Sequence, residues 1–250
     1  MSEPMNILQF DVGNSAAKWR LVCDGDVLAR GVAELEETAS IAKALPAQAS
    51  PHAVWVSSVA SAAVNSQLQQ TLEKSFGMAP WFAETPARTG RLVNSYAEPS
   101  KMGVDRWLAM LGAQARFPTQ ALLVVDVGSA MTIDLVAEDG RHEGGYIIPG
   151  PMLMERALLL DTDRVRFEED IDYRLAPGRS TAEAVRHGIA LAQVGAVLAV
   201  PDLNQRTLAM TGGGATVLSQ LLGGSGQLIP DLVFEGLAVM AAAEGMANRD

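Results

Sequence analysis

Two short acidic turns in the sequence carry residue types that suit phosphate chemistry. The first runs from Asp11 to Lys18, between the apolar run Ile7–Phe10 and a second apolar run that begins at Trp19. Gly13 would let backbone N–H groups approach an anion closely, as in phosphate-holding nests. Asp11 could hold Mg²⁺, and Lys18 could offset phosphate charge. On these residues alone, a plain hairpin turn explains the pattern at least equally well.

The second turn repeats the first at a fixed distance along the chain. Asp126-Val127-Gly128 lies 115 residues after Asp11-Val12-Gly13, and each follows an apolar run of strand length. An Asp-Gly hairpin turn recurs at the same offset, Asp24-Gly25 against Asp139-Gly140. One such turn is common, but two matching patterns of strand, turn and hairpin indicate an internal duplication.

The elements expected around these turns form two α/β lobes, residues 1–117 and residues 118–250. Each lobe is expected to open with a meander of strands and to continue with helices. Beyond the two turns, strands are expected at 27–32, 53–59, 144–148 and 207–210, and helices at 65–76, 107–113, 152–160, 182–200 and 231–246.

Composition excludes several classes of protein. The 250 residues carry a net charge of −10 without a basic cluster, which argues against nucleic acid as the main partner. Cys23 is the only cysteine, so the chain has no internal disulfide, and it fits a reducing cytoplasm. No signal peptide and no membrane-spanning run is recognisable, so a soluble cytoplasmic protein is expected. The histidines, His52, His142 and His187, are scattered and are expected on the surface or in loops.

Motifs of other nucleotide-binding and hydrolytic enzymes are missing from the sequence. It has no Walker A loop, no dinucleotide-binding glycine pattern, no nucleophile elbow and no His-Glu-x-x-His. A third glycine-rich turn, Gly212–Gly214, follows a predicted strand. Together with the two Asp-Gly turns, it suits a nucleoside triphosphate held between two lobes, with metal ions between the acids and the phosphates.

Phosphoryl transfer also needs a base for the acceptor hydroxyl, and Asp105 is the best candidate. It stands between the flexible Gly103 and the cation Arg106, which could hold polar groups of a substrate. From the local pattern alone, however, Asp105 is more often a plain helix N-cap.

Taken together, these stretches resemble the type III pantothenate kinases. The matching segments are 11–18, 103–106, 126–134, 144–150 and 178–181, in order along almost the whole chain. The resemblance implies the fold of acetate and sugar kinases, Hsc70 and actin: two duplicated ribonuclease H-like lobes with mixed sheets around an ATP cleft. It also implies transfer of the ATP γ-phosphate to the 4′-hydroxyl of pantothenate, the first step of coenzyme A synthesis. It further implies a homodimer that needs Mg²⁺ and a monovalent cation, K⁺ or NH₄⁺.

By matching position, the resemblance gives each site residue a role. It makes Asp105 the catalytic base, Asp126 the ligand of the monovalent cation, and Asp11 a ligand of Mg²⁺, directly or through water. The ATP-binding residues it implies are Asp11, Val12, Gly13, Asn14, Ser15, Ala16, Ala17, Lys18 and Ser129. The pantothenate-binding residues it implies are Tyr96, Gly103, Val104, Asp105, Arg106 and Thr181, the last reaching across the dimer.

The chain departs from the family's usual residues at two positions. Ser129 and Ser15 both stand where threonine is common, which keeps the hydroxyl and loses a methyl group. We therefore expect nucleotide binding to survive, with looser packing at Ser129.

Two alternative functions and one structural question stay open at this point. The chain could be a phosphoanhydride hydrolase of the same fold, using water as the acceptor, or a non-catalytic accessory or regulatory relative. The intact acids Asp11, Asp105 and Asp126 argue against the second alternative. The Ala-rich helix from Thr181 to Val200 is either the dimer surface or an internal core helix.

Overall fold

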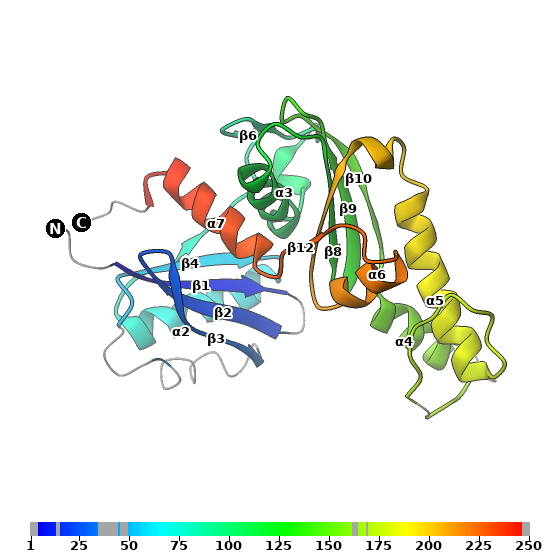
Figure 1. Cartoon of the computed structure of the whole chain (residues 1–250). Coiled ribbons are helices and arrows are strands. Elements are labelled where there is room, and N and C mark those ends of the chain that lie inside the picture. The colour runs from blue at the N-terminus through cyan, green and yellow to red at the C-terminus, as the bar shows by residue number, and fades with distance from the viewer. Residues whose placement is uncertain are drawn as a thin grey trace. The chain divides into compact units, whose positions relative to one another are not determined.

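Figure 1 shows the computed structural model, which describes residues 5–13, 16–34, 45, 50–161, 165–168 and 170–246. The chain forms two compact units: the first contains residues 1–90, 96–112 and 233–250, and the second contains residues 91–95 and 113–232. The predicted lobe boundary after residue 117 marks where the sequence repeat restarts. The compact units follow other limits, because the C-terminal residues group with the first unit, so the lobe boundary stays a prediction.

The first unit is built on a five-stranded sheet in the order β3-β2-β1-β4-β5. Its strands are β1 (Asn6–Val12), β2 (Ala16–Cys23), β3 (Asp26–Glu34), β4 (Ala53–Ser58) and β5 (Trp81–Phe82). β1, β2 and β3 form an antiparallel meander, whereas β4 runs parallel to β1 and β5 runs parallel to β4. Alternate apolar side chains of β1 and β2 are buried in its core.

Helices and short elements complete the first unit. They are α2 (Ala62–Phe76), β6 (Arg88–Thr89), η2 (Pro99–Lys101), α3 (Val104–Arg116) and α7 (Leu232–Ala243). α2 packs on the sheet through Leu68 and Leu72, and the Ser61 side chain caps its start by accepting the Val64 N–H. Gly236 of α7 contacts the Leu108 carbonyl of α3 so closely that a side chain there would collide with the backbone.

The second unit contains a five-stranded sheet with the same strand order as the first, β10-β9-β8-β11-β12. Its strands are β8 (Leu122–Val127), β9 (Ala130–Val136), β10 (His142–Pro149), β11 (Thr207–Thr211) and β12 (Gln227–Leu228). Again three strands form an antiparallel meander, and the fourth and fifth are parallel to the first. The duplication expected from the 115-residue offset is therefore confirmed, strand for strand.

Helices α4 (Pro151–Asp161), α5 (Thr181–Leu198) and α6 (Ala215–Leu221) belong to the second unit, with β7 (Leu92–Val93) and η3 (Leu203–Gln205). Side chains of α5 and α6 pack on one face of the sheet, against Leu123, Val125 and Val127 of β8. Ser180 is the N-cap of α5, and Thr181 is its first helical residue. Among the described helices, none combines the length and the apolar character needed to cross a membrane.

Candidate active site

Asp11 is the centre of a charged row at one end of the first sheet. It is the penultimate residue of β1, with Lys18 opposite it on β2 and Ser57 opposite it on β4. Directly paired residues point to the same face of a sheet, so the three side chains lie in a row. The Ser57 hydroxyl donates to the Asp11 carboxylate at 3.4 Å. Ser57 was not predicted as a site residue, because it lies in an otherwise ordinary apolar strand, one residue before its end.

The environment of Asp11 disfavours its ionised form. Burial is the main cause that raises the pKa of this carboxyl from 3.8 to about 6. The negative charge of Asp105 raises the pKa further, whereas Lys18 and the Ser57 hydrogen bond oppose the rise. Two acids that interact unfavourably are relieved by a cation, so this donor set fits a divalent ion. No group of three His, Cys, Asp or Glu side chains that could hold a metal ion occurs among the described residues.

Asp105 lies in the first turn of α3, as its second residue, and is therefore not the N-cap of that helix. Its Oδ1 accepts the backbone N–H of Arg106 at 2.8 Å. A Cβ on Gly103 would lie 2.6 Å from the same oxygen, so the glycine makes room for the carboxylate. The side chain is half-buried, which leaves part of it accessible to a ligand.

Arg106 and Tyr96, two residues predicted to bind substrate, are brought together. An Nη atom of Arg106 donates to the Tyr96 hydroxyl at 2.9 Å, and the guanidinium carbon lies 5.7 Å from the centre of the tyrosine ring. Arg106 is only 5% exposed. A buried guanidinium fixed by a tyrosine suits recognition of a polar or anionic group.

The remaining parts of the predicted phosphate loop are only partly described. Asn14 and Ser15 lie outside the described residues. The Gly13 N–H donates to the Ala16 carbonyl at 3.0 Å, so it closes the hairpin. Val12 and Ala17 are buried, and their side chains belong to the core of the first sheet.

In the second unit, Asp126 occupies the place that corresponds to Asp11. It is the penultimate residue of β8, with Thr132 opposite it on β9 and Thr211 opposite it on β11. Gly212, with a φ of 88°, lies against this strand end: a Cβ there would collide with the Asp126 carboxylate and lie 2.6 Å from the Val127 carbonyl oxygen. Only glycine permits this approach.

Two more glycines close the same strand end. The Gly214 N–H donates to the Val127 carbonyl at 2.9 Å, and the Gly150 N–H donates to the Ser129 carbonyl at 2.9 Å. The turn at Ser129 is exposed, and so is its side chain. The second unit thus gathers three backbone segments around one carboxylate, at the carboxyl ends of β8 and β11. Thr181 lies elsewhere in this unit, beside an apolar groove between α4 and α5.

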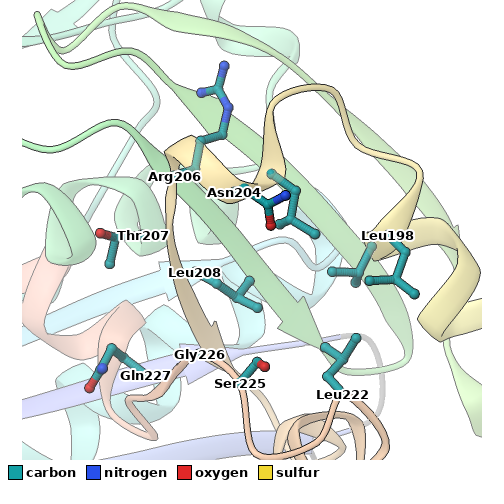
Figure 2. A pocket seen from close by; sticks show the side chains of 11 residues that line it. Leu198, Asn204, Arg206, Thr207, Leu208, Leu222, Ser225, Gly226 and Gln227 are labelled. Carbon is teal, nitrogen blue, oxygen red and sulfur yellow. The ribbon is translucent and has the colours of Figure 1, made fainter.

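A pocket of about 440 Å³ lies at the other end of the second sheet (Figure 2). Leu198, Leu208 and Leu222 give it an apolar wall, and Arg206 extends away from them. The pocket includes Thr207, the first residue of β11, whereas Asp126 pairs with Thr211 at the last. It is therefore separate from the candidate site.

The positions of two histidines correct the expectation from sequence. His142 and His187 are buried, and only His52 is exposed. Burial is tolerated because each buried ring has a polar partner: His142 contacts the Asp134 carboxylate, and His187 contacts the Ala176 carbonyl. Both partners come from other elements or loops, which local sequence does not reveal.

Comparison with known proteins gives one consistent family. A family model described as type III pantothenate kinase matches residues 7–202. A type III pantothenate kinase of Hahella chejuensis is 36% identical over 242 residues, covering 96% of this chain and 98% of the relative. The relative in Chromohalobacter salexigens is 38% identical, with 95% of this chain and 89% of the relative covered. One in Pseudomonas aeruginosa is 37% identical, covering 95% of this chain and all of the relative.

Solved structures with low sequence identity show the same fold. A conserved putative Baf family transcriptional activator from Campylobacter jejuni superposes with a TM-score of 0.64 at 20% identity, covering 96% of this chain and 99% of the other. A putative 2-dehydro-3-deoxygalactonokinase from Sinorhizobium meliloti gives 0.55 at 14% identity, covering 95% and 99%. The ADPNP-bound activator of 2-hydroxyisocaproyl-CoA dehydratase from Clostridium difficile gives 0.51 at 13%, covering 97% of each chain. The expected actin-like α/β fold is confirmed.

Proposed function

This chain belongs to the type III pantothenate kinase family, and we propose that it transfers the γ-phosphate of ATP to the 4′-hydroxyl of pantothenate, the first step of coenzyme A synthesis. The observation that carries this function is the family match, which extends over nearly the full length of this chain and of its relatives. The acids that phosphoryl transfer requires are all present, so a non-catalytic relative is not favoured.

Asp105 is the proposed base. Its carboxylate accepts the proton of the 4′-hydroxyl as that oxygen bonds to the γ-phosphorus, and the bond from phosphorus to the ADP oxygen breaks. The structure supports this role in two ways: Asp105 is half-buried, and its charge is felt by Asp11. Arg106, held by Tyr96, and the backbone of Gly103 and Val104 are the proposed contacts to pantothenate.

In the first unit, the proposed ATP contacts are the residues from Asp11 to Lys18. In the second unit, the proposed contact is the exposed hydroxyl of Ser129. Kinases of this family use ATP with a divalent ion, which neutralises phosphate charge when bound. Asp11 is the proposed protein ligand, because its carboxylate lies in the row with Lys18 and Ser57 and interacts unfavourably with the charge of Asp105, which a divalent ion would offset.

Asp126 is the proposed ligand of a monovalent cation, K⁺ or NH₄⁺. The surroundings of Asp126 support this role, because its carboxylate lies beside the backbone of Val127 and Gly212. Oxygen donors of this kind suit a hard cation of low charge.

A homodimer is the proposed assembly, and the apolar surface over α4 and α5 is its proposed interface. Met152 is 72% exposed, Leu160 is 65% exposed and Leu191 is 62% exposed, and a groove of about 710 Å³ runs between the two helices. Exposed apolar surface of this kind typically marks an association site. α5 also buries Ile189, Val194 and Val197 within its own unit, so its other, exposed face is the part proposed for the interface. Light scattering of a Leu191→Glu variant tests the assembly; a dimer as stable as the wild type would contradict this interface.

The proposed compartment is the cytoplasm, where ATP is available and where the lone Cys23 would stay reduced. The net charge of −10 supports the view that nucleic acid is not a partner.

An assay of ADP release tests the proposed reaction against hydrolysis. We expect release that depends on added pantothenate, and that falls when Na⁺ replaces K⁺. Equal ADP release with and without pantothenate would favour the phosphoanhydride hydrolase. An unchanged rate of ADP release after Na⁺ replaces K⁺ would contradict the proposed role of Asp126 as a ligand of a monovalent cation.

A further inference from the structure

A buried chain of hydrogen bonds lies in the second unit and includes no residue given a role so far. The His142 ring lies with Nε2 3.1 Å from the Asp134 carboxylate and with Nδ1 2.9 Å from the Ser95 hydroxyl. Asp134 and His142 are each only 1% exposed. Asp134 is on β9 and His142 begins β10, whereas Ser95 comes from the segment that precedes η2.

The order of donors along this chain follows from its chemistry. A carboxylate only accepts hydrogen bonds, so Nε2 of His142 must carry the proton that faces Asp134. In the neutral ring, Nδ1 is then an acceptor, and the Ser95 hydroxyl donates to it. Asp134 thus fixes the tautomer of His142, and His142 fixes the direction of the Ser95 hydroxyl. This arrangement resembles the way in which outer carboxylates orient functional histidines.

Ser95 is the last residue of a segment, 91–95, that is attached to the second unit at several points. Arg91 donates to the carbonyls of Pro118 and Glu138 at 2.6 and 3.0 Å, and the Val93 N–H donates to the Gly140 carbonyl at 3.0 Å. Farther along the same segment, the Ser95 hydroxyl is bonded to His142. The next residue is Tyr96, which belongs to the first unit.

We propose that Asp134, His142 and Ser95 are positioning residues for the pantothenate site, acting through Tyr96. The Ser95 bond restrains the backbone immediately before Tyr96, and the Tyr96 hydroxyl in turn accepts from the Arg106 guanidinium at 2.9 Å. Loss of the bond leaves the contacts of Arg91 and Val93 in place but releases the residue that leads into Tyr96. This inference rests on the proposed pantothenate kinase activity.

Ser95→Ala is the variant that tests the proposal most cleanly. It removes only the hydroxyl and leaves the buried pair of Asp134 and His142 intact. Ser219→Ala is its matched control: that hydroxyl donates to the Ser225 carbonyl at 3.2 Å, and α6, which carries it, packs on the sheet face that Asp134 does not occupy. Ser95→Thr restores a hydroxyl at the same position.

The KM for pantothenate and the KM for ATP are measured separately for each variant. For Ser95→Ala we expect the pantothenate KM to rise about fivefold, the size expected of one lost hydrogen bond, with the ATP KM within twofold of wild type. Ser95→Thr should return the pantothenate KM to within twofold. Ser219→Ala should leave both KM values unchanged, because its hydroxyl lies on the other face of the sheet. A loss of general stability, in contrast, would change both KM values alike.

A double-mutant cycle tests whether Ser95 acts through Tyr96. In a Tyr96→Phe background, Ser95→Ala should raise the pantothenate KM by less than half as much as in the wild type. The proposal is overturned if Ser95→Ala leaves the pantothenate KM within twofold, if it raises both KM values alike, or if the two substitutions add fully. A wild-type chain that does not phosphorylate pantothenate is a different result, since it overturns the proposed function itself.

Discussion

The two Asp-Gly turns occupy equivalent places in a duplicated fold but have different neighbours. In the first unit the row across three strands is Lys18, Asp11 and Ser57, and in the second unit it is Thr132, Asp126 and Thr211. One acid therefore lies opposite a cation, whereas the other lies between two hydroxyl-bearing side chains.

The backbone around the two acids differs as well. Among the described residues, a Cβ on Gly13 would approach only the Ala16 carbonyl oxygen, at an ordinary 3.7 Å. Gly212 has no room for a Cβ beside Asp126. The two units thus share one strand order, but their turns differ: the first carries side-chain charge, and the second has tightly packed backbone.

The largest effect is expected in the first unit, where the chemistry is assigned. Asp105→Asn keeps the size of the side chain but cannot accept the hydroxyl proton, so kcat should fall by about 10²–10⁴-fold. ATP binding, measured by calorimetry, should stay near the wild-type value. Near-normal turnover in this variant would place the proton transfer elsewhere.

A pair of glycine substitutions tests the contrast in backbone packing. Gly212→Ala forces a methyl group against Asp126 and Val127 at a positive φ and should destabilise the protein by about 1–3 kcal/mol. Gly13→Ala meets no such neighbour in the part of the chain that the structure describes, and it should change stability by less than about 1 kcal/mol. Urea unfolding of both variants gives the comparison; equal losses would show that the two turns are packed alike.

The buried charge of Asp11 is expected to lower the free energy of unfolding at neutral pH. Since burial raises the pKa of Asp11 to about 6, its ionisation opposes folding above that pH. Asp11→Asn should therefore stabilise the protein by about 1–3 kcal/mol at pH 8. The gain should shrink as the pH falls from 6 to 3.8, because the folded carboxyl takes up its proton in this range while the unfolded one stays ionised, and it should vanish below 3.8, where both are protonated. Urea titrations at several pH values measure this, and a gain that does not depend on pH would contradict the charge as its cause.

The smallest effect is expected at the turn of the second unit. Ser129→Thr adds only a methyl group to an exposed side chain, so the KM for ATP should change by less than about threefold. Ser129→Ala removes the hydroxyl and should raise the KM for ATP by more than the threonine variant changes it. A Ser129→Ala variant with a wild-type KM for ATP would contradict a role of Ser129 in nucleotide binding.

Features repeated within the sequence were the most predictable part of the fold. The 115-residue offset between Asp11 and Asp126 correctly indicated two related sheets, because strand, turn and hairpin recur together. The start of α3 was predicted three residues late. The prediction followed the apolar run from Trp107, whereas the observed helix already begins at Val104. α6 was missed, because it is short and directly follows the glycine-rich turn that ends at Gly214.

Contacts between distant residues were not predictable from local pattern. Ser57 meets Asp11 only through the parallel pairing of β1 with β4, whose register depends on tertiary packing. His142 was expected on the surface or in a loop, but it is buried, and its partners Asp134 and Ser95 lie 8 and 47 residues away in the sequence. The roles of Asp105 and Tyr96 came from family resemblance, and the structure adds that Tyr96 holds Arg106.

The most direct test of the account follows the phosphorus atoms in a single reaction. Wild-type protein, Mg²⁺, K⁺, ATP and pantothenate are mixed, and the products are identified by ³¹P NMR. We predict one new phosphomonoester signal, formed in equal amount to ADP, and a signal that forms at least about 100-fold more slowly with Asp105→Asn. Inorganic phosphate appearing in equal amount to ADP, without the ester, would contradict the assignment of this chain as a pantothenate kinase.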